Sequence, residues 1–395
     1  MTATIRDAAR PFSGGALTAL LSPAPRLLAL GEPTHGVEAF PELRNELFRH
    51  LVEHEGYRSI AIESDCLAAL VADAYVGDGT GTLDGAMDLG FSHGFGASPA
   101  NRELLRWMRA YNERRPAPER LRFYGCDAPL EMTGAASPRE ALTRVHEYLA
   151  AARLDLPWSP ADLDALLGPD ERWTDPGTLM DPARSVGRTP EAGRLRLIAD
   201  DLGVLLDAHA PDLTEATSPD AFWRASLHAR TATGLLRYHA ALADTAPGRL
   251  GALVSLRDVL MADHLDAVAR REARRGPTLV FAHNGHLQRD PSHMEFAGRR
   301  LRWWSAGALV SARLGDRYAF AATAFGSRGA DVPGPDTLEG LLSALPHDRC
   351  VVDPGRLAAA LDRTPPPRVP ADHTYAAFDP DATGRTDALV FVREV

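Results

Sequence analysis

The chain has 395 residues and a formal net charge of −10, with 45% hydrophobic and 24% charged residues. This composition is typical of a globular protein with one large domain or two smaller ones, and the acidic balance argues against a nucleic-acid partner. The sequence contains no lysine, which excludes Schiff-base catalysis and a P-loop nucleotide site.

Cysteine spacing and the absence of long apolar runs give a first expectation about location. Cys66, Cys126 and Cys350 are widely spaced and form no zinc-binding or redox motif. Reduced thiols in a cytoplasmic protein fit this pattern best. The first residues lack the apolar core of a signal peptide, and no apolar run reaches the length of a membrane span. We therefore expect a cytoplasmic protein with no membrane partner, and the sequence leaves its oligomeric state open.

Short apolar runs along the chain predict six buried strands. They cover residues 26–30, 58–62, 121–126, 277–282, 317–322 and 388–392. Helical patterns lie between most of them, and the clearest occupy residues 37–55, 100–114 and 338–345. Alternation of strands and helices predicts an α/β fold, with a central, mostly parallel sheet flanked by helices.

The middle of the chain has a different pattern. Residues 136–275 show almost no strand signal and predict helices at about 138–153, 160–167, 190–209, 218–245 and 250–275. We interpret this segment as a large helical insertion that covers the active-site edge of the sheet and helps to form a substrate pocket. It would separate a first part of the α/β core, residues 1–135, from a second part, residues 276–395.

Polar side chains cluster where four of the predicted strands end. The first strand runs into GEPTHG, the second into IESD, the third into GCD and the fourth into AHNGH. Ligands of open α/β sheets bind at the carboxyl ends of parallel strands, which share one edge. These ends supply Glu32, His35, Glu63, Asp127, His283 and His286.

Each of these residues also has a purely structural explanation. Carboxylates such as Glu32, Glu63 and Asp127 suit a helix N-terminus, and a lone histidine is most often an exposed loop residue. Their coincidence at four strand ends favours a functional site. Further candidates for substrate binding are Arg44, Asp127, His93 and Arg257. The helices of Arg44 and Arg257 could bring them to the same edge, and His93 lies in a glycine-rich loop.

The residue types indicate acid–base chemistry on an activated water molecule. The sequence has no GxSxG nucleophile motif and no cysteine beside a histidine motif. We expect His35 to act as the base, with Glu32 or Glu63 orienting it. His283, His286 or Arg44 would stabilise the developing charge or bind substrate. The same imidazoles and carboxylates could instead bind Zn²⁺ or Mn²⁺, so the sequence predicts no cofactor but keeps a divalent metal as an alternative.

Five separate motifs then resemble those of the erythromycin esterase family. They are GEPTHG with a following arginine, IAIESD, FYGCD, RDVLMA and AHNGH, in the family's order from about residue 25 to 325. The resemblance implies an α/β fold with a helical region over the sheet, and a metal-free histidine base in the first motif. It also implies that Glu32, His35, Arg44, Glu63, His283 and His286 occupy active-site positions.

The function implied by the resemblance is hydrolysis of a cyclic, macrolactone-like ester, which would fit antibiotic resistance. The segment FSHGFGA lacks tryptophans that are usual in the family, and Asp263-His264 replace a common Glu-Asn, so the substrate stays open. A second hypothesis is a tailoring enzyme of antibiotic biosynthesis, which would cyclise, dehydrate or isomerise a polyketide-like substrate with the same groups. A non-catalytic binding protein ranks last, because every motif position is filled.

Overall fold

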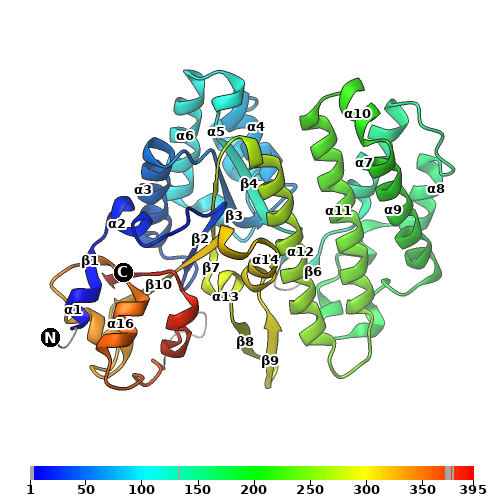
Figure 1. Ribbon diagram of the computed structural model, residues 1–395. Coiled ribbons are helices and arrows are strands. Elements are labelled where there is room, and N and C mark those ends of the chain that lie inside the picture. The colour runs from blue at the N-terminus through cyan, green and yellow to red at the C-terminus, as the bar shows by residue number, and fades with distance from the viewer. Residues whose placement is uncertain (1–3, 132–133, 370–374, 376–377) are drawn as a thin grey trace. The chain divides into compact units, whose positions relative to one another are not determined.

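The computed structural model describes residues 4–131, 134–369, 375 and 378–395. The chain divides into two compact units, which Figure 1 draws in one view. The sheet unit comprises Met1–Glu63, Ala69–Cys126 and Leu265–Val395, and the helical unit comprises Ser64–Ala68 and Asp127–His264.

The sheet unit is built on an eight-stranded sheet. Its strands lie in the order β1 (Ala9–Pro11), β11 (Arg349–Val352), β12 (Ala388–Glu394), β10 (Tyr318–Ser327), β2 (Leu27–Glu32), β7 (Thr278–His283), β3 (Ser59–Asp65) and β4 (Arg122–Asp127). The neighbours from β12 through β3 pair in parallel, and β1 and β11 add antiparallel pairs at one edge. The predicted fold class, a mostly parallel α/β sheet flanked by helices, is confirmed.

Continuous apolar runs located the parallel strands because both faces of this sheet are covered. All six residues of β2 are buried, and five of the six in β7 are buried. The two antiparallel strands were not predicted. β1 is three residues long and largely exposed, and β11 begins with an exposed arginine, so neither presents a long apolar run.

Amphipathic helices cover the sheet as their patterns predict. α3 (Ala39–His54) buries Phe40, Leu43, Leu47 and Leu51 in the core cluster formed with the strands. Gly56 lies just beyond the end of this helix in the left-handed region at φ 73°, a conformation that glycine adopts readily. The other helices of this unit are α1 (Ile5–Ala8), α2 (Gly14–Thr18), α4 (Ala69–Asp78), α5 (Leu83–Leu89), α6 (Pro99–Glu113), α13 (Asn284–Leu287), α14 (Ala306–Leu314), α15 (Leu338–Ser343) and α16 (Pro354–Ala360).

The helical unit packs around its own core. Its helices are α7 (Arg139–Ala151), α8 (Pro160–Leu167), α9 (Pro190–Ala208), α10 (Ala210–Ala216), α11 (Pro219–Leu242) and most of α12 (Arg249–Arg271). Four of them, α7, α8, α9 and α11, bury one apolar cluster that includes Leu142, Leu195 and Leu236. The predicted helices of the middle segment are therefore present, with α10 as an addition.

Two small antiparallel pairs of strands were also not predicted. β5 (Leu130–Glu131) pairs with β6 (Gly134–Ala135), and β8 (Pro291–Phe296) pairs with β9 (Arg299–Trp304). β9 alternates exposed arginines with buried Leu301 and Trp303, a half-buried pattern that was overlooked beside the apolar strands. The compact units change over at Asp127 and His264, whereas the predicted insertion spans 136–275. The three-part division and the position of the insertion over the sheet edge stay predictions.

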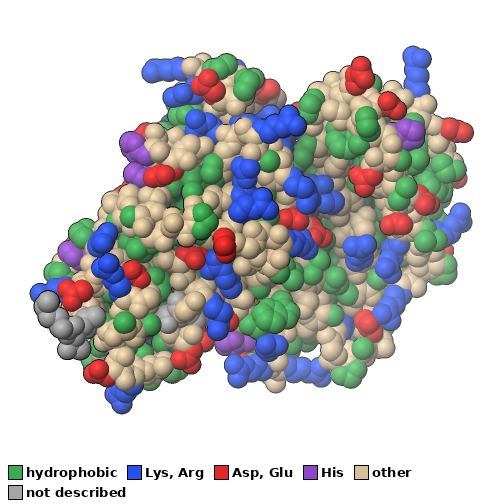
Figure 2. Space-filling model, viewed as in Figure 1, with side chains coloured by type: hydrophobic (Ala, Val, Ile, Leu, Met, Phe, Trp, Pro, Cys, Tyr) green, Lys and Arg blue, Asp and Glu red, His purple; other side chains and the backbone are tan. Residues whose placement is uncertain are grey.

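Charges of both signs are interspersed over the face that Figure 2 shows. Many arginines pair with acidic residues, as Arg184 Nε does with Asp175 at 2.8 Å. The three cysteines are free and buried. In the part of the chain that the structure describes, no helix combines the length and hydropathy needed to span a membrane.

Two buried histidines make the helical unit sensitive to acid. Burial lowers the pKa of His228 to about 4, and the nearby Arg144 and Arg224 add to this effect. Burial likewise lowers the pKa of His239 to about 4, although Nε2 hydrogen-bonds to the Ala136 carbonyl at 2.9 Å. Both rings are therefore neutral in the folded protein at neutral pH, whereas the unfolded chain binds their protons near pH 6.5.

We expect stability to fall as pH drops through the window from about 6.5 to 4, because the unfolded state binds more protons there. Each histidine contributes a loss of about 2 kcal/mol between pH 7.5 and pH 5. His228→Leu should remove its share, so thermal unfolding of the variant should depend less on pH than that of the wild type. An equal fall in the unfolding midpoint of both proteins would contradict this explanation.

Candidate active site

The ends of β2, β3 and β7 bring most of the predicted residues together. Glu32 is the last residue of β2 and pairs in register with His283, the last residue of β7. Glu63 lies near the end of β3, which flanks β7 on its other side. His35 and His286 follow within three residues of the ends of β2 and β7. The predicted juxtaposition of Glu32, His35, Glu63, His283 and His286 is therefore present in the sheet unit.

His35 is held by the carboxylate of Glu32. Its Nδ1 lies 2.5 Å from Glu32 Oε1, across the turn that follows β2. The side chain of His35 is 39% exposed, whereas that of Glu32 is 6% exposed. A carboxylate on Nδ1 favours the tautomer that carries its proton there, so Nε2 is left with the lone pair. This is the arrangement expected of a general base whose Nε2 faces substrate or water.

Glu63 lies between the other imidazoles. One oxygen, Oε2, accepts the backbone N–H of His283 at 2.7 Å. The other, Oε1, is 3.4 Å from His286 Nε2 and 3.8 Å from His35 Nε2. Because Glu63 is only 3% exposed, its negative charge acts on both rings with little screening by water. The carboxylate is placed to stabilise positive charge that appears on His35.

His283 is engaged by the backbone on both sides of its ring. Nδ1 accepts the Gly285 N–H at 3.2 Å, so Nε2 carries the proton and donates to the Pro33 carbonyl at 3.2 Å. These two bonds join the turn after β7 to the turn after β2. The bonding favours a positioning role for His283, whereas the sequence placed it among the catalytic groups. Its catalytic role stays a prediction.

The asparagine of AHNGH closes a gap between two strands. β2 pairs with β10 as far as Leu30, and beyond it the two strands separate. Asn284 fills this space: its Nδ2 donates to the Thr323 carbonyl at 2.8 Å, and its Oδ1 accepts the Thr323 N–H at 3.3 Å. The amide thus replaces a missing strand residue directly beside Gly31. A Cβ at Gly31 would lie 2.1 Å from Asn284 Oδ1, which explains the glycine of GEPTHG.

Gly31→Ala should therefore displace Asn284 and the turns that carry His35 and His286. Overpacking of this kind costs about 1–3 kcal/mol, and we expect a lower unfolding midpoint together with a loss of at least about tenfold in kcat/KM. Gly193→Ala in α9 is the matched control, because a Cβ there has no atom within 4 Å. That change should leave activity unaltered and stabilise the chain slightly. Equal behaviour of the two variants would refute the role given to Asn284.

Predicted residues from several elements line one pocket of about 400 Å³ in the sheet unit. They are Glu32, His35, Arg44, Glu63 and His93. The lining also includes residues that the sequence did not single out, namely Glu38, Phe95, Asn101 and Phe281. The sequence gives little indication of these residues. An apolar strand residue such as Phe281, and polar residues near helix starts such as Glu38 and Asn101, are common in any α/β protein.

Arg44 brings a buried positive charge to this pocket. It is 1% exposed, its Nε and Nη2 donate to Asn45 Oδ1 at 3.1 and 2.8 Å, and its guanidinium lies 4.9 Å from the Phe281 ring centre. Burial lowers the pKa of Arg44 to about 10, so the side chain remains a cation at neutral pH. The negative charges of Glu32 and Glu38 oppose this lowering of the pKa. An oxyanion formed in the pocket would therefore meet a fixed cation.

Glu32 is an unusual carboxylate because it is buried beside another one. Burial raises its pKa above the usual range, and Glu63 adds to the rise, while the hydrogen bond and charge of His35 and the charge of Arg44 oppose it. Because the pKa of Glu32 is higher in the folded protein than in the unfolded chain, folding favours its protonated form. This contribution to stability is fully present below the ordinary pKa of a glutamate, and it is lost as pH rises through the folded-state pKa. Perturbed carboxylates of this kind cluster at functional sites.

His93 lies in the loop before α6, within the segment FSHGFGA. Its φ of 56° is left-handed, an uncommon conformation for a residue other than glycine, and Gly94 follows at φ 73°. The His93 ring packs edge-on against Phe95, and Phe95 in turn lies 5.4 Å from the His35 ring, centre to centre. The loop thus presents two rings to the pocket in which His35 lies.

Asp127 and Arg257 belong to the helical unit, where they pair with each other. Arg257 Nε and Nη2 donate to Asp127 Oδ2 at 3.0 and 2.7 Å, and Asp127 Oδ1 accepts the Ala128 N–H at 2.9 Å. Asp127 is fully buried. A strand, β5, follows Asp127, so these bonds make it the ion-pair partner of Arg257 and not the helix cap considered from the sequence. Substrate binding by either residue stays a prediction.

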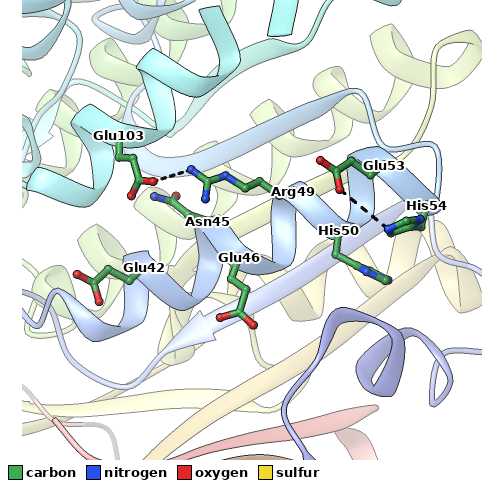
Figure 3. Close-up of a pocket in the computed structure, with 8 residues that line it drawn as sticks. All are labelled: Glu42, Asn45, Glu46, Arg49, His50, Glu53, His54 and Glu103. Carbon is green, nitrogen blue, oxygen red and sulfur yellow. Dashed lines mark hydrogen bonds and ion pairs between the residues drawn. The ribbon is translucent and has the colours of Figure 1, made fainter. Parts of the chain in front are cut away.

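A second pocket lies on the outer face of α3 and is lined by charged side chains (Figure 3). Its volume is about 500 Å³. Arg49 Nη2 contacts Glu103 Oε1 at 2.6 Å, and His54 Nε2 lies 4.0 Å from Glu53 Oε2. None of the predicted site residues lines it. Among the described residues, no group of three or more His, Cys, Asp or Glu side chains is arranged to hold a metal ion.

Comparisons with solved structures agree with the fold. The chain resembles a protein of Bacillus cereus with a TM-score of 0.71 at 18% identity, over 99% of this chain and 96% of that one. It resembles a succinoglycan biosynthesis protein with a TM-score of 0.72 at 17% identity, over 99% and 95% of the two chains. A mutant of erythromycin esterase EreC in its open conformation gives 0.65 at 19% identity, over 95% and 92%.

Comparisons of sequence identify the family. The chain is 25% identical over 276 residues to erythromycin esterase type II of Escherichia coli, which covers 67% of this chain and 61% of that relative. It thus spans about three fifths of the relative's length. The family model for erythromycin esterase matches residues 52–395, most of the sequence. The chain therefore belongs to the erythromycin esterase family.

Proposed function

We propose that this protein is a hydrolase that opens a cyclic, macrolactone-like ester of a small molecule by activating water with His35. Membership of the erythromycin esterase family supports an esterase-like activity in general. The observation that carries the finer proposal is the pair of His35 Nδ1 and Glu32 Oε1 at 2.5 Å in the wall of a pocket. Arg44 lines the same pocket and supplies a positive charge.

The reaction follows from these positions. His35 Nε2 takes a proton from water while the water oxygen forms a bond to the acyl carbon, and Glu32 and Glu63 stabilise the imidazolium that results. Arg44 stabilises the oxyanion of the tetrahedral intermediate. When the intermediate collapses, the bond from the acyl carbon to the ester oxygen breaks, and His35 returns its proton to that oxygen. The products are a carboxylic acid and an alcohol, which remain in one molecule when the substrate is a lactone.

We propose that the reaction needs no metal. The groups that could act as ligands already bind one another: Glu32 contacts His35, Glu63 accepts the His283 N–H, and backbone groups engage both nitrogens of His283. The purified protein should therefore keep its activity in EDTA and contain no stoichiometric zinc or manganese by elemental analysis. Activity that is lost on chelation and restored by one of these ions would instead support the metal alternative.

Mass spectrometry tests the reaction type directly. We expect the purified protein to convert erythromycin, or a related member of a panel of macrocyclic lactones, to a product heavier by one water molecule. A product of unchanged mass would instead indicate cyclisation or isomerisation, and loss of one water would indicate dehydration. Either result would reject hydrolysis. A cytoplasmic location and the absence of nucleic-acid and membrane partners are parts of the same proposal.

A further inference from the structure

One part of the wall of the active-site pocket is formed by Glu38, before α3, and by the first turn of α6. Glu38 Oε2 accepts two hydrogen bonds, from the Ser98 hydroxyl and from the Ala100 N–H, both at 3.1 Å. Glu38, Ser98 and Asn101 all line the pocket. The second carboxylate oxygen, Glu38 Oε1, has no hydrogen-bond partner in the described part of the chain.

Asn101 supplies an independent sign that something is missing from this wall. The residue is 4% exposed, and its Nδ2 donates to the Phe95 carbonyl at 2.9 Å, which fixes the orientation of the amide. Its Oδ1 is buried and accepts no hydrogen bond from any described residue. Buried amide oxygens nearly always have a partner, because leaving one without a partner is costly. A group from outside the chain is the natural partner in a pocket wall.

The two oxygens belong to one hydrogen-bonded network that already uses most of its own donors. The Asn101 N–H donates to Ser98 Oγ at 3.2 Å, and the Ser98 hydroxyl donates to Glu38. Asn101 Nδ2 is bound to Phe95. The network therefore offers a ligand two acceptor oxygens, whereas the second hydrogen of Asn101 Nδ2 is the one donor that these bonds leave uncommitted, so it favours a hydroxyl or a protonated amine over an ether oxygen.

We propose that Glu38 and Asn101 form a substrate-binding subsite that recognises a hydrogen-bond donor, a hydroxyl or ammonium group, carried by the substrate away from its ester. The proposal rests on the proposed function, because it takes this pocket to be the substrate pocket. Glu38 lies at the start of α3 and Asn101 in the first turn of α6, and both line the pocket that contains His35, so the subsite fixes the donor group relative to His35. It selects substrates by their polar substituents rather than by their ester bond.

Binding of three simple probes tests the subsite without any hydrolysis. Hexan-1-ol, hexylammonium and 1-methoxyhexane share an apolar chain and differ in the donor that they carry. Ligand-observed NMR titration of the full chain should show that the alcohol binds about three- to tenfold more tightly than the ether, the usual effect of one hydrogen bond. The ammonium should bind at least as tightly as the alcohol, because Glu38 adds a charge.

Three variants separate a ligand contact from a structural role. Asn101→Ala should abolish the preference for the alcohol over the ether, whereas Asn101→Asp, which keeps an acceptor but loses the amide donor to Phe95, should retain it. Glu38→Gln should lower the affinity for the ammonium about tenfold and leave the alcohol within about threefold. Thermal unfolding checks that each variant is folded.

Two results would overturn the proposal. One is equal binding of the alcohol and the ether by the wild type. The other is an equal loss of all three probes in Asn101→Ala and Asn101→Asp, which would show that the bond to Phe95 is the residue's whole contribution. The outcome is independent of the hydrolysis assay. A donor preference without hydrolysis of any ester would reject the proposed function and keep the subsite, and hydrolysis without a donor preference would do the reverse.

Discussion

His35→Ala should lower kcat/KM for the hydrolysed ester by more than about 10²-fold, the usual scale for the loss of a general base. The reason lies in the position of the ring. Its Nδ1 is bound to Glu32 at 2.5 Å, so Nε2 is the nitrogen that can accept a proton in the pocket. The measurement is steady-state hydrolysis of the ester identified by mass spectrometry.

Two further variants make this result interpretable. Removing the His35 ring leaves the buried Glu32 carboxylate without its hydrogen bond, and His35→Gln restores an amide donor to it while providing no base. Both variants should be inactive, and the glutamine variant should unfold closer to the wild-type temperature. His54→Gln changes an exposed histidine on the far end of α3 and should leave kcat/KM unaltered. Near wild-type turnover in His35→Gln would show that His35 is not the base.

The sequence predicted the strands that place this site because those strands are buried on both faces. β2 reads as an unbroken apolar run for this reason, and Glu32 interrupts the run at the strand's end. The same logic placed Glu63 and His283 at neighbouring strand ends, and the register confirms that Glu32 and His283 lie opposite each other. β1 and β9 escaped prediction because exposed residues interrupt their apolar patterns.

Contacts with backbone groups could not be predicted from the sequence. His283 and His286 read as equivalent members of one motif, but only the fold brings the Pro33 carbonyl to the ring of His283. His286 instead has its ring nitrogen 3.4 Å from Glu63. Spacing along the chain predicts that the two histidines share an edge of the sheet. It does not predict that backbone groups form hydrogen bonds with the ring of His283.

Asn101 was overlooked for a similar reason. In the sequence it is one polar residue in the first turn of an amphipathic helix, where a solvated position is the usual expectation. Its burial depends on the loop at 91–98, whose carbonyl at Phe95 receives the Asn101 amide. Glu38 was likewise not singled out, because its bonds to Ser98 and Ala100 join segments some sixty residues apart. Long-range pairing of this kind has no local pattern.

Glu63→Gln should lower kcat/KM by about 10- to 100-fold, equivalent to about 1.4–2.7 kcal/mol of transition-state stabilisation. The variant removes a buried negative charge 3.8 Å from His35 Nε2, where the imidazolium forms during proton transfer. It changes the shape of the side chain very little. Its amide oxygen can still accept the His283 N–H, which Glu63 accepts at 2.7 Å. The comparison therefore separates the charge from the hydrogen bond.

Glu63→Ala completes the comparison, since it loses both the charge and the acceptor for His283. If Glu63 acts mainly by holding the turn after β7, the glutamine variant will keep activity within a few-fold of the wild type while the alanine variant fails. If its charge stabilises His35, the glutamine variant will lose most of what the alanine variant loses, with KM nearly unchanged, because the charge matters only once a proton has moved. The geometry favours the second result, since Oε1 faces two imidazoles and Oε2 alone serves the backbone.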